Sequence, residues 1–210
     1  MHKGHITYQI TVLHSIYISR QIYKYTKMDL PDFLKVAIPL VVAPVGGALL
    51  FKHHFAGHNN AKRLLTFKNL DECVDELEKI QQASSLDIES DWTLYQNLIH
   101  CAQSIEYSMY GFPQNKSVLF QKTLGKLVLN QFEKQGYMRH NRNEPIPGAT
   151  PIEPNGNAVE AVTRLQKAIT DFDQFDQPLK PHFAYGALTK SQFANAHCMH
   201  CADHFAMMTY

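Results

Sequence analysis

Residues 94–113 read LYQNLIHCAQSIEYSMYGFP, and this stretch predicts the fold class. Its apolar residues recur at steps of three and four, which is the period of an amphipathic helix. Asp91 is the expected start of this helix, and the Gly-Phe-Pro at 111–113 stops it. The same period recurs before and after it, over 70–80 (with Asn69 or Asp71 as the cap), 117–132, 158–175 and 190–210. The sequence therefore predicts an all-α fold built as a bundle of four or five helices.

The longest connection between these predicted helices runs from Gly136 to Gly156 and contains NRNEPIPGATPIEPNG. Its four prolines and three asparagines forbid regular structure and predict a loop. Pro178 and Pro181 break the chain again before Thr189, which is expected to cap the last helix.

The composition limits the classes of function that the chain can have. The chain has 210 residues, enough for one domain with an appendage. Lys and Arg total 20 against 19 Asp and Glu, which argues against a nucleic-acid protein with a broad basic surface. Four cysteines do not form a disulfide scaffold. Twelve histidines are unusual, because histidine binds metals and titrates near neutral pH.

Residues 1–27 differ from the rest of the chain, because they carry four basic and no acidic side chains. Met28 follows directly. We favour Met28 as the natural start, with 1–27 a non-native extension, and keep a basic peripheral segment as the alternative.

Residues 28–57 form an apolar N-terminal segment around VAIPLVVAPVGGALLF at 36–51, sixteen uncharged residues. This run is short for a membrane-spanning helix, which needs about 20 residues, but has the length of a signal-peptide core. One interpretation is an export signal or anchor that associates with a membrane through 36–51. On this interpretation, a bacterial cell envelope is a slightly better expectation for the protein's location than the cytoplasm. The other is a buried hairpin of the fold.

The last predicted helix, SQFANAHCMHCADHFAMMTY at 191–210, carries three histidines on one face. His197, His200 and His204 fall on a stripe about 60° wide at 100° per residue. The i, i+4 step of His200 and His204 suits one divalent ion, and such clusters suit the core of a bundle. The alternative is a set of hydrogen-bonded core or surface histidines. The Cys-x-x-Cys at 198–201 has no second pair, so Cys201 is at most an additional ligand.

His100 lies on the polar side of the predicted helix around it, with Gln103, Ser104 and Tyr107. Such a face is solvent-exposed by default. It can instead line a cleft against the last helix and help to orient a ligand there.

The helix around His100, the proline-rich loop and PLKPHFAYGALTKSQFANAHCMHCADHF at 178–205 together resemble the DinB-like superfamily, and within it the DUF1569 branch. The phrase from Pro181 to Thr189 matches the family's link into its last helix, with one extra residue, and Phe193 stands where relatives have tryptophan.

The resemblance implies that residues 58–210 form a DinB-like four-helix bundle. It also implies a divalent metal ion held by His100, His200 and His204. His197, Asp203 and Tyr107 are candidates for an extra ligand or a supporting contact. Zinc and nickel are the first metals we expect.

The resemblance and the histidines leave several functions open. The first hypothesis is a metal-dependent hydrolase or thiol-dependent transferase that acts on a small molecule. The second is a non-catalytic metal-binding or stress-related protein, and the third is a bundle without metal. A catalytic ion keeps a free coordination position, whereas a structural ion is closed by a fourth protein ligand, for which His197 and Cys201 are candidates. A homodimer is compatible with the sequence.

Overall fold

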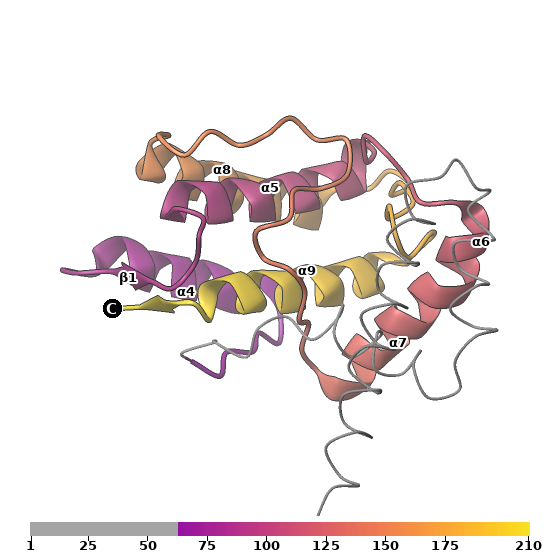
Figure 1. Cartoon of the computed structure of the whole chain (residues 1–210), viewed down its shortest axis with the longest axis horizontal. Helices are drawn as coiled ribbons and strands as arrows, with labels where there is room; N and C mark the ends of the chain where they lie inside the picture. Colours follow the sequence, from indigo (N-terminus) through magenta and orange to yellow (C-terminus); the bar gives the residue numbers. More distant parts are fainter. Residues whose placement is uncertain (1–62) are drawn as a thin grey trace, which may run out of the picture. The chain divides into compact units, whose positions relative to one another are not determined.

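The computed structural model describes residues 63–210 (Figure 1). The predictions for residues 1–27 and for the apolar segment 28–57 lie outside these described residues. Within 63–210, no helix combines the length and the apolar character that crossing a membrane requires.

The described residues are mostly helical, which confirms the predicted all-α class. Short helices and strands fill the connections between the long ones. The elements in chain order are α4 (Leu70–Gln82), β1 (Asp87–Ile88), α5 (Leu94–Tyr110), α6 (Val118–Phe120), the π-helix η1 (Gln121–Gly125), α7 (Lys126–Gln135), α8 (Ala158–Gln174), α9 (Lys190–Phe205) and β2 (Met208–Thr209).

Polar caps set where the helices begin. Asn69 caps α4 by accepting a hydrogen bond from the backbone N–H of Glu72 at 3.0 Å. Thr93 and Gln96 form a capping box at the start of α5, so this helix begins later than the predicted Asp91. Thr189 begins α9 with the same kind of box, as the sequence predicted for its cap.

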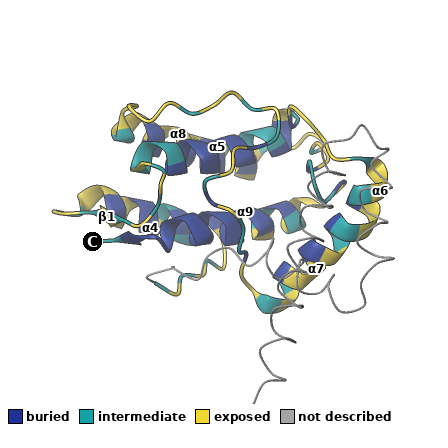
Figure 2. Cartoon of the chain, viewed as in Figure 1, coloured by how far each residue is buried: buried dark blue, intermediate teal, exposed yellow. Residues whose placement is uncertain are grey.

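Four helices enclose the main core. α5 packs against α8, α4 packs against α9, and the two pairs meet through contacts of α5 with α9 and of α4 with α8 (Figure 1). Fully buried side chains such as Leu77, Leu98, Leu165 and Phe205 come from all four helices. Figure 2 shows that α9 is buried along most of its length, whereas α4 and α8 each keep an exposed side. A side chain on α9 is therefore shielded from solvent almost wherever it points.

Two predicted helices differ from the helices in the structure, one by an interruption and one by an earlier end. The helix predicted over 117–132 is interrupted by η1, where Gly125 packs its Cα against the backbone oxygen of Ala184. The last helix does not reach the C-terminus, because it ends at Phe205 and the chain then forms β2. This strand pairs antiparallel with β1, with Ile88 opposite Met208. Sequence periodicity could not show either feature, since both depend on contacts with distant parts of the chain.

The link into α9 is a tight loop that docks on η1. His182 and Gly186 exchange two backbone hydrogen bonds, of 2.8 and 3.0 Å. Gly186 has a φ of +74°, a conformation that favours glycine. Gln121 of η1 donates to the backbone oxygen of Phe183 at 3.2 Å. These contacts fix the starting point of α9 relative to the segment α6–η1–α7.

Candidate metal centre

Four histidines turn their rings toward one another. His100 comes from α5, His200 and His204 come from α9, and His140 comes from the segment that joins α7 to α8. One ring nitrogen of each lies within 4.8 Å of those of the other three. The Nε2 atoms of His100 and His200 are 3.2 Å apart, as are those of His140 and His204. Among residues 63–210, no other group of histidine, cysteine and carboxylate side chains has this spacing.

The spacing fits ligands that share one ion. Two nitrogens on a tetrahedral zinc ion lie about 3.3 Å apart, because each Zn–N bond is about 2.0–2.1 Å. The two 3.2 Å pairs match this separation. The wider pairs, up to 4.8 Å, require a small inward movement of the rings.

The face of α5 that carries His100 is buried. His100 is 3% exposed, and Gln103 and Ser104 on the same face are 9% and 8% exposed. The sequence left open whether this face meets solvent or the last helix. The contact between His100 and His200 shows that it meets α9. The i, i+4 step then brings His204 to the same side of α9 as His200.

Asn97 fixes the position of the hydrogen on His204. The Asn97 side-chain amide donates to the backbone oxygens of Trp92 and Thr93, at 3.0 and 2.9 Å. Its Oδ1 therefore faces Nδ1 of His204, at 2.7 Å. Because an amide oxygen only accepts hydrogen bonds, Nδ1 carries the hydrogen, and Nε2 presents a lone pair to the cluster.

Asp203 lies beside His140. Its Oδ2 is 3.0 Å from Nδ1 of His140, a close charge contact that lacks hydrogen-bond alignment. Its Oδ1 accepts a hydrogen bond of 2.6 Å from the Arg142 side chain, and Arg142 also donates to the Asp203 backbone oxygen at 2.9 Å. Arg142 thus holds the carboxylate beside Nδ1 of His140, while Nε2 of His140 lies 3.2 Å from Nε2 of His204.

The contact between His140 and His204 needs a hydrogen or a cation. Their Nε2 atoms are 3.2 Å apart, and Nε2 of His204 presents a lone pair. Either a hydrogen on Nε2 of His140 or a metal ion among the nitrogens can therefore occupy the space between them. In addition, the Nδ1 atoms of His100 and His200 are buried without a hydrogen-bond partner. These two ring nitrogens therefore lack a hydrogen-bond partner among the described protein groups.

Burial keeps the helix-borne histidines neutral. Desolvation, with a smaller contribution from the neighbouring His140, lowers the pKa of His100 to about 3. Burial and the neighbouring histidines lower the pKa of His200 and His204 well below the usual value. Neutral imidazole is the form that binds metal ions. The donor set and its protonation therefore fit a divalent ion.

Trp92 covers one side of the cluster. Its ring meets that of His100 edge-on, with centroids 5.1 Å apart, and stacks over His204 at 6.5 Å. It is the only tryptophan in the chain. Its fluorescence should therefore report on events at this site.

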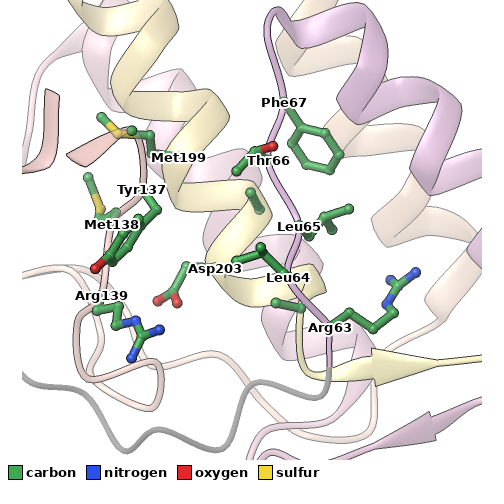
Figure 3. Close-up of a pocket in the computed structure, with 13 residues that line it drawn as sticks. Arg63, Leu64, Leu65, Thr66, Phe67, Tyr137, Met138, Arg139, Met199 and Asp203 are labelled. Atoms are coloured by element: carbon green, nitrogen blue, oxygen red, sulfur yellow. The ribbon is translucent and has the colours of Figure 1, made fainter. Parts of the chain in front are cut away.

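A small cavity lies beside Asp203 (Figure 3). Its walls include Leu64, Tyr137, Met138 and Met199, and the Asp203 carboxylate is directed toward the side of Arg139. The cavity has a volume of about 40 Å³. This is space for about three or four waters, at 10–15 Å³ for each. Asp203, the carboxylate beside His140, thus borders a small cavity with mostly apolar walls.

The structure brings together His100, His200 and His204, the three histidines that the resemblance implied. Asp203 contacts the cluster through His140, as a supporting carboxylate. The other two candidates lie elsewhere. His197 packs between Phe193 and Phe172 and contacts the Ser108 hydroxyl at 3.2 Å. Tyr107 lines a separate surface cavity with Glu106 and Arg164.

His197 lies outside the cluster because it sits about 10.5 Å before His204 along the α9 axis, at 1.5 Å per residue, on the far side of His200. A shared stripe on the helix does not make a shared site. Cys201, the other candidate for a closing ligand, is buried in the apolar core beside Cys101.

Sequence reasoning missed His140. It lies in an irregular segment, where helical periodicity says nothing about direction. The arginines on either side of it, Arg139 and Arg142, are an unusual surrounding for a core histidine, but they do not point to a partner. The contacts that position it, to Asp203 and His204, are formed only in the folded chain.

The fold and the site define a class: a mostly helical protein with a cluster of four histidines, three of which are buried. The family model described as "Protein of unknown function (DUF1569)" matches residues 59–210. The chain therefore belongs to the DUF1569 family. Neither the curated proteins nor the solved structures contain a match.

Proposed function

We propose that this protein binds one divalent metal ion through His100, His200 and His204, within a DinB-like four-helix bundle formed by α4, α5, α8 and α9. The observation that carries this proposal is the convergence of ring nitrogens within 4.8 Å of one another, with the lone pair of His204 Nε2 directed into the cluster by Asn97. Zinc and nickel suit an all-imidazole donor set and are our first candidates.

Such an ion, when it has a free coordination position, lowers the pKa of a water or thiol and makes it a nucleophile. This chemistry supports a metal-dependent hydrolase or a thiol-dependent transferase acting on a small molecule. The chain's own contribution is to keep His100, His200 and His204 neutral by burial and to orient His204 through Asn97. Trp92 supplies an apolar wall against which a ligand can pack.

A non-catalytic metal-binding or stress-related role is the second candidate, and one observation favours it. His140 offers a fourth imidazole, and zinc ions with four protein ligands usually stabilise a fold. In this case, the ion would join α5, α9 and the segment between α7 and α8.

Elemental analysis of the full-length protein, purified without an affinity tag or chelator, tests the proposal. Because His53, His54 and His58 could hold an ion of their own, their triple alanine variant is the matched control. We expect about one ion per chain in the parent and in this control, and little in His100→Ala/His204→Ala. A parent without stoichiometric ion, or an ion lost only in the control variant, would refute the proposal.

A further inference from the structure

Residues 136–157, which join α7 to α8, form an irregular segment that we call the strap. It leaves α7, passes α9, and crosses α5 before it reaches α8 (Figure 1). Met138 is buried near its start, packed with Val128, Phe132 and Met199. Arg142 is 8% exposed and holds Asp203 of α9 by two hydrogen bonds. The strap is thus anchored on α9 on both sides of His140.

From Asn143 onward, the strap is tied to the start of α5 and the residues just before it. Asn143 donates to the Asp91 carboxylate at 2.7 Å and accepts from Ser90 at 3.1 Å. Further along, Gln96 donates to the backbone oxygen of Ile152 at 2.9 Å. The strap therefore links the two helices that carry the other three histidines.

His140 differs from those three histidines in two ways. Its side chain is 25% exposed, whereas His204 is 0% exposed. It also lies in irregular backbone, while the others lie within α5 and α9. His140 can leave the cluster by a local movement of the strap, whereas the departure of His100 or His204 would disturb a helix and its core.

We propose, resting on the function proposed above, that His140 is a fourth and displaceable ligand of the ion, and that the ion fastens the strap to α5 and α9. An incoming donor would replace His140: its bond to the ion would form as the bond to His140 Nε2 breaks, and the His140 ring would stay beside Asp203. The coordination position that chemistry needs would pass in this exchange from His140 to the donor, on the exposed side of the cluster.

Two measurements on the full-length protein loaded with Co²⁺ test the inference. The first is the visible spectrum, which reports the coordination geometry. We expect His140→Gly to keep the ion but to lose the spectrum of the parent, and imidazole added to the solution to restore it. His140 is exposed enough for imidazole to enter its place. Rescue by free imidazole is not expected of a residue with only a packing role.

The second measurement is cleavage by trypsin after Arg139 and Arg142, which flank His140 in the strap. In the parent we expect the ion to slow this cleavage at least about tenfold relative to protein in EDTA, because binding reduces the population with an open strap. In His140→Gly the ion should give no such protection. Glu144→Gln, which changes an exposed strap residue, should behave as the parent does.

The outcomes separate the two proposals. If His140→Gly binds Co²⁺ with the parent's spectrum and the same protection from trypsin, His140 is not a ligand, and the three-histidine site stands without it. If the parent binds no ion, both proposals are overturned. Loss of the parent spectrum with recovery in imidazole supports both.

Discussion

Asn97 offers the sharpest test of how the cluster is organised. It is fully buried, and its side chain makes three hydrogen bonds, to His204 and to the backbone oxygens of Trp92 and Thr93. Thr93 keeps a second donor, the backbone N–H of Asn97, when the side chain is removed. Asn97→Ala therefore leaves two newly unpaired groups, Nδ1 of His204 and the oxygen of Trp92.

Each unpaired buried group costs about 1–3 kcal/mol, so Asn97→Ala should lower the free energy of unfolding by about 2–6 kcal/mol. For a chain of this size, the lower figure corresponds to a fall in Tm of at least about 4 °C. Loss of the group that orients a metal-binding histidine typically weakens binding by about 10- to 100-fold. We expect this loss for Zn²⁺ or Ni²⁺ measured by titration calorimetry on chelator-treated protein.

Asn97→Asp is the matched control. Aspartate keeps an acceptor for Nδ1 of His204 but loses the two donated bonds to Trp92 and Thr93. It should lose stability as Asn97→Ala does, yet bind the ion about as tightly as the parent. Equal ion affinity in Asn97→Ala and the parent, or equally weak binding in both variants, would refute the argument that Asn97 sets the tautomer of His204.

Three further predictions concern the surroundings of the site. Ni²⁺ or Cu²⁺ should quench the fluorescence of Trp92, and quenching that persists in His100→Ala/His204→Ala would place the ion elsewhere. Burial lowers the pKa of His182 and His197 to about 3, below the value of about 6.5 in the unfolded chain. Their contribution to stability is therefore complete above about pH 6.5 and is lost as the pH falls toward 3. Urea unfolding in EDTA should show this decline, and His197→Leu should flatten it; an unchanged slope would contradict the assignment. All four cysteines are buried, so a thiol reagent should label none in the native protein and four after denaturation, and rapid native labelling would contradict the packing.

The fold class was predictable because the helices of this chain carry regular apolar periods and strong local caps. Thr189 and the proline before it mark the start of α9 without any knowledge of its neighbours. The π-helix was not predictable, because Gly125 there meets the backbone of Ala184, which is far away in the sequence. The end of α9 at Phe205 was missed for a similar reason, since β2 exists only through its pairing with β1.

The histidines on helices could be predicted from the sequence, and the histidine in an irregular segment could not. The step between His200 and His204 indicated a shared face directly. His100 was found through the family resemblance, because its own helix suggested a polar surface. Asn97, which orients His204, looked like an ordinary polar residue of the same helix, and only its burial shows its role. His140 could not be placed at all, since an irregular segment has no period from which to infer direction.

The capping boxes of α5 and α9 determine where the chain tolerates insertions and deletions without disturbing the site. Thr93 and Thr189 fix the first turns of α5 and α9, so His100, His200 and His204 each stand at a set number of residues from a fixed origin. One residue inserted between Thr93 and His100 would rotate His100 by about 100° and shift it by about 1.5 Å, out of the cluster. An insertion among the exposed residues 153–156 adds only to a loop, which chains absorb at small cost. Length variation among related chains should therefore gather at the end of the strap, and the intervals from cap to helix-borne histidine should stay constant.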